Sequence, residues 1–211
     1  MNPPASPAVP LLAAHRVAFA RNDEPVFGPL DFSVDRGETL LVEGDNGSGK
    51  TTLLRVLAGM LPGEGEIRFD GAPASRDSRN GRVLLLGHRL GMNESLSARE
   101  NLGFLTGLYG TRDGATVESA LAAVGIEAWI DEPLRNLSAG QKKRVGLARL
   151  LLLPGDLWLL DEPYANLDRH GIERVNALIA WHCSRSGAAL VTSHGAVRFA
   201  DPDARHIRLA A

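Results

Sequence analysis

GDNGSGKT, residues 44–51, is the stretch that decides the fold, because it fits the phosphate-binding pattern G-x-x-x-x-G-K-[ST]. The largely apolar run ETLLVE at 38–43 precedes it and predicts a strand, and GKTTLLRVLAGM at 49–60 follows with apolar residues at helical spacing. Glycines let backbone N–H groups converge on phosphate oxygens, and the helix adds the positive end of its dipole. The stretch therefore predicts a nucleotide-binding loop between a strand and a helix of an α/β protein.

The residues of this loop are expected to contact ATP. Lys50 should reach the β- and γ-phosphates and take a catalytic part, and the Thr51 hydroxyl should ligate the Mg²⁺ that is bound with the nucleotide. A flexible glycine turn with a surface lysine is the alternative, and the flanking strand and helix argue against it. The predicted ATP-binding residues of the loop are Gly44, Asp45, Asn46, Gly47, Ser48, Gly49, Lys50, Thr51 and Thr52.

LWLLDE, residues 157–162, supplies the second part of the site. An apolar strand that ends in Asp161 puts a carboxylate at the carboxyl edge of the sheet, where open α/β sheets bind ligands. Asp161 should hold the magnesium through water. Glu162 points differently from its neighbour on an extended chain, so it should orient and deprotonate the attacking water as a catalytic residue. Without the phosphate loop, two solvated acids at the end of a strand would be the favoured interpretation.

Strand-like and helical segments alternate along the rest of the chain, as is typical of α/β proteins. Between about 92 and 150 the pattern is almost wholly helical, which predicts an inserted helical lobe. Residues 1–11 are expected to form a disordered, proline-rich lead-in, and residues 12–211 a single domain. Further strands are predicted at 82–87, which should be buried, and near 188–194 and 204–210, and helices at 97–110, 114–125, 138–152 and 171–186.

Composition limits the class of partner. The 23 basic and 25 acidic residues of the 211 nearly cancel, so we expect no nucleic-acid partner. Cys183 is the only cysteine, which excludes an intrachain disulfide and fits a reducing cytoplasm. The N-terminus does not fit a signal peptide, and no stretch approaches the roughly 20 apolar residues that cross a bilayer. A membrane role would need a partner on another chain.

LSAGQ, residues 137–141, resembles the signature of ATP-binding-cassette (ABC) ATPases, with Ala139 where glycine is commonest. Taken alone, Ser138 and Gln141 form an S-x-x-Q capping box for the helix that follows. The resemblance implies that this capped helix binds the γ-phosphate held by a second subunit, through Ser138, Gly140 and Gln141. It therefore implies a head-to-tail homodimer with two composite ATP sites.

Three further segments agree with the family in order and spacing. Ala165-Asn166-Leu167-Asp168 resembles the D-loop, which crosses the dimer interface, and Glu100-Asn101-Leu102 resembles the start of the helical lobe. His194 matches the switch histidine that contacts the γ-phosphate, and the resemblance gives it a catalytic part; a lone histidine after a strand is more often structural. The implied fold is a P-loop NTPase with a RecA-like core and an inserted helical subdomain.

Two positions depart from the commonest form of the family. His88 stands where a glutamine usually senses the γ-phosphate and magnesium, and either that role or a simple loop histidine is open. The adenine-stacking position, usually aromatic, falls at Arg21, whose guanidinium can stack on a purine. Phe19 is the nearest aromatic alternative.

Within the family, four segments resemble the haem-exporter ATP-binding subunits of bacterial cytochrome c maturation (Ccm) transporters: LGH at 86–88, ENLGF at 100–104, LSAGQKKRVGLARLLL at 137–152 and LWLLDEPYANLD at 157–168. In that group histidine at the glutamine position and LSAGQ are usual. The resemblance implies Ccm B and C type transmembrane subunits and a peripheral place on the cytoplasmic face of the inner membrane.

The same resemblance implies a role in delivering haem to, or releasing it from, a periplasmic chaperone, so that haem is involved only indirectly. Cys183 lies on an apolar helical face and is interpreted as a small core residue rather than a haem ligand. An ATPase subunit for another cargo is the alternative function, and a non-transport nucleotide switch or a P-loop kinase is more remote.

Overall fold

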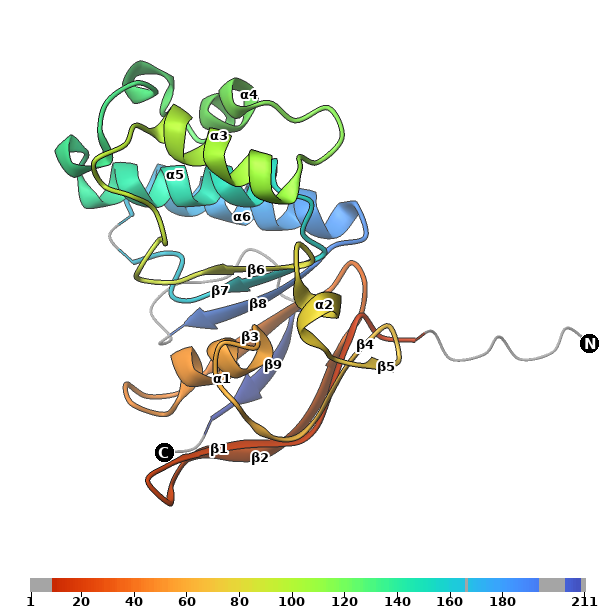
Figure 1. Cartoon of the computed structure of the whole chain (residues 1–211). Coiled ribbons are helices and arrows are strands. Elements are labelled where there is room, and N and C mark those ends of the chain that lie inside the picture. Colours follow the sequence, from red (N-terminus) through yellow and green to blue (C-terminus); the bar gives the residue numbers. More distant parts are fainter. Residues whose placement is uncertain (1–8, 166, 194–203, 210–211) are drawn as a thin grey trace, which may run out of the picture.

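The computed structural model describes residues 9–165, 167–193 and 204–209, which form two sheets and several helices (Figure 1). One sheet is parallel, with strand order β6-β7-β8-β3-β9, and the other is antiparallel, with order β2-β1-β4-β5. The strands are β1 (Leu12–Arg21), β2 (Glu24–Val34), β3 (Thr39–Glu43), β4 (Glu64–Phe69), β5 (Ala72–Pro73), β6 (Val83–Leu86), β7 (Leu157–Leu160), β8 (Ala188–Ser193) and β9 (Arg205–Arg208). The helices are α1 (Lys50–Leu57), α2 (Arg76–Arg79), α3 (Ala98–Tyr109), α4 (Val117–Ala123), α5 (Ala139–Leu152) and α6 (Arg169–Ser184), with short 3₁₀ turns at Glu127–Trp129 and Leu134–Asn136.

The parallel sheet is covered on both faces, which explains why β7 is continuously apolar. Side chains alternate between the two faces of a strand. Leu157 and Leu159 therefore pack into a core with α1 and the antiparallel sheet, whereas Trp158 and Leu160 pack into a second core with α5 and α6. All four are buried, and the prediction of a strand at this position is confirmed.

Helix α1 lies between the parallel and the antiparallel sheets (Figure 1). Its buried side chains include Leu53, Leu54 and Leu57, at the spacing of one helical face. They share a core with Leu12 of β1 and Phe32 of β2. The helix that begins at the phosphate loop is thus held from two sides.

Helices α3, α4 and α5 form the lobe at the top of Figure 1, at the positions where the sequence predicts three helices. Helix α5 also packs over the parallel sheet beside α6, so it connects this lobe to the core. Leu102, Leu121, Val145 and Val175 belong to one continuous cluster that runs from α3 to α6. Among the described residues, no helix has the length and apolar character needed to cross a lipid bilayer.

Two details differ from the sequence-based expectations. The predicted buried strand at 82–87 is the edge strand β6, in which Leu86 is buried but Val83 and Leu84 remain partly exposed. An edge strand has a neighbour on one side only, and its apolar run does not reveal that position. Helix α2 was not predicted, because its single turn has no apolar period; a capping box between Ser75 and Ser78 holds it.

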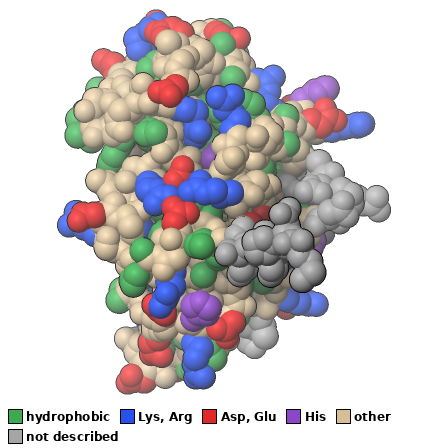
Figure 2. All heavy atoms as spheres, turned by 90° about the vertical axis from the view of Figure 1, so that its right-hand side faces the viewer, with side chains coloured by type: hydrophobic (Ala, Val, Ile, Leu, Met, Phe, Trp, Pro, Cys, Tyr) green, Lys and Arg blue, Asp and Glu red, His purple; other side chains and the backbone are tan. Residues whose placement is uncertain are grey.

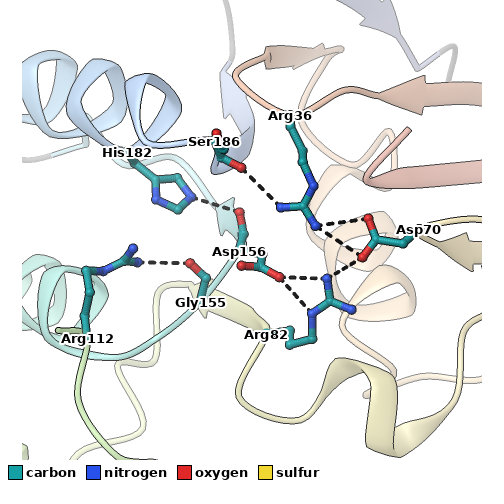
Figure 3. A network of polar contacts seen from close by, with 8 residues as sticks. All are labelled: Arg36, Asp70, Arg82, Arg112, Gly155, Asp156, His182 and Ser186. Carbon is teal, nitrogen blue, oxygen red and sulfur yellow. Dashed lines mark hydrogen bonds and ion pairs between the residues drawn. The ribbon is translucent and has the colours of Figure 1, made fainter. Parts of the chain in front are cut away.

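Loops at the amino edge of the parallel sheet are joined by a chain of ion pairs (Figure 3). Arg82 contacts both Asp70 and Asp156 at 2.7 Å, and Arg36 contacts Asp70 at 3.0 Å. Basic and acidic side chains are interspersed on the face in Figure 2. Because these groups are partly exposed, each pair contributes only about 0–1 kcal/mol to the free energy of unfolding. The network fixes the edge opposite the predicted nucleotide site.

Candidate ATP site

The phosphate loop joins the end of β3 to the start of α1, as predicted, and its shape depends on glycine. Gly47 and Gly49 have φ angles of +88° and +93°, in the left-handed region that favours glycine. A Cβ on Gly49 would lie 3.0 Å from Val26 O and 3.2 Å from the Phe27 side chain. Strand β2 therefore packs directly against the loop and fixes the point where α1 begins.

Lys50 is buried and lies against the backbone of the loop itself. Its Nζ donates hydrogen bonds to Gly44 O at 2.6 Å and to Asp45 O at 2.8 Å. The ammonium is thereby held at the loop that should receive phosphate groups. The hydroxyl of Ser48 is also buried there, with no partner recorded within the described residues. Both the Lys50 ammonium and the Ser48 hydroxyl could therefore donate hydrogen bonds to a polar ligand in the loop.

Thr51 and Asp161 meet although they are far apart in the sequence. The Thr51 hydroxyl donates to Asp161 Oδ2 at 2.8 Å, and the buried Thr192 hydroxyl donates to Asp161 Oδ1 at 3.0 Å. The Thr51 hydroxyl and the Asp161 carboxylate are oxygen donors. Such donors suit Mg²⁺, which is usually bound through one or two carboxylates plus substrate phosphates.

Glu162 follows Asp161 with a backbone turned away from the extended form. Its φ angle is +47°, which is unusual for a residue with a Cβ and is found where the surroundings enforce it. Its N–H donates to Thr192 Oγ1 at 2.9 Å. An extended chain was expected at this residue from the sequence, and that expectation is wrong, because Glu162 lies in a left-handed turn after β7. Its role as general base stays a prediction.

His88 is exposed in the loop after β6 and lines the same cavity as Thr51 and Asp161. The volume of this cavity is about 570 Å³. Arg149 of α5 holds the loop on both sides of His88, because its guanidinium donates to Leu85 O and to Leu90 O, the latter at 2.8 Å. The structure places His88 in the cavity that Thr51 and Asp161 also line, and both the sensor role and the simple loop histidine stay predictions.

The signature segment caps α5. The backbone N–H of Ser138 donates to Gln141 Oε1 at 2.8 Å, and the N–H of Gln141 donates to Ser138 Oγ at 3.2 Å. The capping box expected from the sequence is therefore present. Ser138 and Ala139 are exposed, and Gly140 is partly exposed. This helix N-terminus is open to a second molecule.

The remaining predicted positions are less fully defined. His194 and Asn166 lie outside the described residues. Asp168 caps α6, with Oδ1 accepting from Gly171 N at 2.7 Å. Of the two adenine candidates, Arg21 is exposed, and Phe19 stacks beside Phe27 with ring centroids 6.5 Å apart. The roles of these residues stay predictions.

Three residues that the sequence analysis did not single out contribute contacts here: Thr192, Lys143 and Arg149. Lys143 of α5 donates to Glu162 O at 2.7 Å and to Ala165 O at 3.0 Å. Burial lowers the pKa of Lys143 to about 8, and the Glu162 and Asp161 carboxylates oppose that shift. The position of Thr192 near the end of β8 was a usable signal, because strand ends at this edge carry ligand-binding groups.

Known proteins resemble this chain in sequence over most of its length. Residues 27–165 match the ABC transporter family. The chain is 58% identical over 203 residues to the cytochrome c biogenesis ATP-binding export protein CcmA of Xanthomonas oryzae pv. oryzae, with 96% of this chain and 94% of that protein covered. It is 44% identical to the protein of the same name from Methylococcus capsulatus, with 88% and 92% covered.

Solved structures agree on the fold. A putative ABC transporter ATP-binding protein from Pyrococcus furiosus has a TM-score of 0.79 at 25% identity, with 94% of this chain and 96% of that chain covered. The ATP-binding cassette MJ0796, solved as a dimer in a post-hydrolysis state with ADP and Pi, has a TM-score of 0.76 at 21% identity, with 87% and 88% covered. The predicted fold class is confirmed. The chain belongs to the ABC transporter family of ATP-binding proteins, in the group of cytochrome c biogenesis ATP-binding export proteins.

Proposed function

We propose that the chain binds Mg-ATP and hydrolyses it as half of a homodimer, and so drives transmembrane subunits of a cytochrome c biogenesis transporter. The observation that carries the ATPase part is the convergence of Lys50, Thr51, Asp161 and Glu162 at the carboxyl edge of one parallel sheet. Family membership adds that such proteins work as ATP-binding parts of transporters.

The chemistry follows from what each group can do. Lys50, now bonded to loop carbonyls, would donate to the β- and γ-phosphate oxygens, and Thr51 and Asp161 would hold Mg²⁺, the latter through water. When bound, Mg²⁺ supplies positive charge to the phosphate oxygens. Glu162 would accept a proton from water as that water attacks the γ-phosphorus and ADP leaves. His88 and His194 would contact the γ-phosphate.

The dimer proposal rests on the exposed N-terminus of α5. The first turn of a helix offers N–H groups and a positive dipole to an anion. Ser138, Gly140 and Gln141 would reach the γ-phosphate of the ATP bound to the second subunit. The dimeric ADP and Pi state of the cassette MJ0796 supports this arrangement as an analogy.

A docking surface for the transmembrane subunits is proposed on the helical lobe and on the adjoining segment after α1. Large apolar side chains are exposed at Met60 (65%), Phe104 (64%), Leu108 (59%) and Tyr109 (44%). Met60 and Tyr109 line a groove of about 520 Å³ that also contains Arg79. Exposed apolar groups beside a groove are typical of protein contact sites. We propose that residues 12–211 act as one domain, with residues 92–150 as the lobe that meets the membrane subunits.

The cargo pathway is inferred from the relatives, whose names assign them to cytochrome c biogenesis. We infer Ccm B and C type partners, a peripheral place on the cytoplasmic face of the inner membrane, and an indirect relation to haem. No nucleic-acid role is proposed. An ABC transporter for another cargo is the alternative, since the nucleotide site itself does not identify what is moved.

A deletion strain tests this pathway. Cells that lack the chain should make c-type apocytochromes without attaching haem, whereas b-type cytochromes should assemble normally. Complementation should work with the wild-type gene and fail with Lys50→Ala or Glu162→Gln, because both variants lack hydrolysis. A haem stain of c-type cytochromes measures the result. Normal staining in a deletion strain without a duplicate system would leave the ATPase proposal standing and remove the pathway.

A further inference from the structure

Lys143 joins the signature helix to the loop that carries the predicted general base. Its ammonium donates to Glu162 O at 2.7 Å and Ala165 O at 3.0 Å, both ordinary hydrogen-bond distances. These two carbonyls stand at the two ends of the four-residue turn after β7. Ala165 N also donates to Glu162 O at 3.2 Å, so the turn is closed on itself and fastened to α5.

The backbone of Glu162 needs such fastening. Its φ angle of +47° places it in the left-handed region, which is unfavourable for a residue with a Cβ. Thr192 Oγ1 accepts from its N–H at 2.9 Å, and Lys143 donates to its carbonyl. Both backbone groups of Glu162 are therefore held by side chains from other elements. Removing either contact would allow the residue to relax toward a common conformation and turn its side chain.

The same helix begins at the predicted signature residue. Ser138 caps α5, and Lys143 lies in its second turn. Farther along, Arg149 holds the loop that carries His88, through Leu85 O and Leu90 O. Rigid secondary-structure elements are among the parts of a protein that carry a displacement from one site to another. A shift at its N-terminus would therefore be transmitted to the turn that contains Glu162.

We propose that Lys143 is a positioning residue that sets the direction of the Glu162 carboxylate and couples it to the signature end of α5. The inference rests on the proposed function, in which Glu162 is the general base. A misplacement of about 1 Å in a reacting group can cost on the order of 100-fold in rate. The effect should fall on kcat, since Lys143 contacts the turn after β7 rather than the phosphate loop.

The experiment compares variants of the chain assembled with its membrane subunits. Lys143→Met keeps the aliphatic stem and removes the donors, and it should lower kcat for ATP hydrolysis about 10- to 100-fold. The KM for ATP and the thermal midpoint should change little. Lys143→Arg should recover most of the activity, because a guanidinium can donate to two carbonyls.

Lys142→Met is the matched control. Lys142 is the neighbouring lysine, and its Nζ pairs with Glu94 Oε1 at 3.0 Å, where the Glu94 side chain is 66% exposed. Such a pair contributes little, so kcat should stay close to that of the parent protein. A Lys143→Met enzyme as active as this control would overturn the inference. Equal loss of kcat, ATP binding and thermal stability in Lys143→Met and Lys143→Arg would also overturn it, by indicating a purely structural role.

Glu162→Gln separates this inference from the proposed function. A normal rate in Glu162→Gln would remove Glu162 as the base, and with it the reason for positioning. An inactive Glu162→Gln beside a normal Lys143→Met would leave the proposed function intact and contradict only the role of Lys143.

Discussion

The imidazole of His182 lies flat against the indole of Trp158, with ring centroids 3.9 Å apart and planes within 3°. His182 is buried between α6 and β7, and its Nε2 lies 3.0 Å from Asp156 O (Figure 3). Burial, and secondly the charge of Arg112, lowers the pKa of His182 to about 4. The folded protein therefore keeps this imidazole neutral at pH values where an exposed histidine is charged.

A pH dependence of stability follows. Between pH 6.5 and pH 4 the unfolded chain binds a proton at His182 and the folded chain does not, so stability falls as the pH falls through this window. The loss should be on the order of 3 kcal/mol by pH 4. His182→Phe should reduce the slope of stability against pH, because phenylalanine binds no proton. Its ring can still stack on Trp158, and Asp156 O still accepts from Ala188 N. Urea unfolding at several pH values measures the free energy of unfolding and therefore this slope.

The parent protein, unfolded in urea at the same pH values, provides the reference for this experiment. Equal slopes in His182→Phe and the parent protein would contradict the buried neutral imidazole.

Glu162→Gln should bind ATP and fail to hydrolyse it. Glutamine keeps the size of the side chain but cannot take a proton from water, so kcat should fall about 10²- to 10⁴-fold, equivalent to roughly 3–5 kcal/mol of barrier lowering. The measurement is phosphate release, with nucleotide binding followed separately. A loss confined to binding would show that Glu162 acts at another step.

Ser138→Asp separates helix capping from contact with phosphate. Aspartate is a good N-cap, so the thermal midpoint should be unchanged. Its negative charge should repel the γ-phosphate of the second subunit and prevent the ATP-bound dimer, which Glu162→Gln should otherwise accumulate. Light scattering with Mg-ATP and the membrane subunits, in the Glu162→Gln background, measures the dimer. Ser138→Asn is the neutral capping control and should retain dimers; their persistence in Ser138→Asp would refute the composite site.

His88→Gln should keep substantial activity, and His88→Ala should impair coupling. Glutamine restores a polar group at the loop that faces Thr51 and Asp161, whereas alanine removes it. A transport assay in membranes, run beside the ATPase rate, compares the two variants. Equal function of both would favour a simple loop histidine.

The sequence predicted those parts of the site that depend on local patterns. The strand before Gly44, the helix after Gly49, and the cap formed by Ser138 and Gln141 each follow from spacing over a few residues. A second rule, that open α/β sheets bind ligands at the carboxyl ends of their strands, predicted that Asp161 lies near this loop.

Contacts between distant side chains and backbone carbonyls could not be predicted in this way. Lys143 and Arg149 occupy ordinary helical positions, and nothing in the chain indicates that their partners are the carbonyls of Glu162 and Leu90. The exposure of β6 was missed for a related reason, because strand order is set by tertiary packing rather than by the apolar run.

The order of the parallel sheet also has a consequence for synthesis on the ribosome. Strand β3, which leads into the phosphate loop, pairs with β8 and β9, and both are translated long after it. Its apolar residues Leu40, Leu41 and Val42 emerge long before the strands that cover their edges. Long-range parallel pairing of this kind is slow and leaves nascent chains prone to aggregation. A chaperone that shields β3 until β8 and β9 have been translated would therefore raise the yield of folded protein.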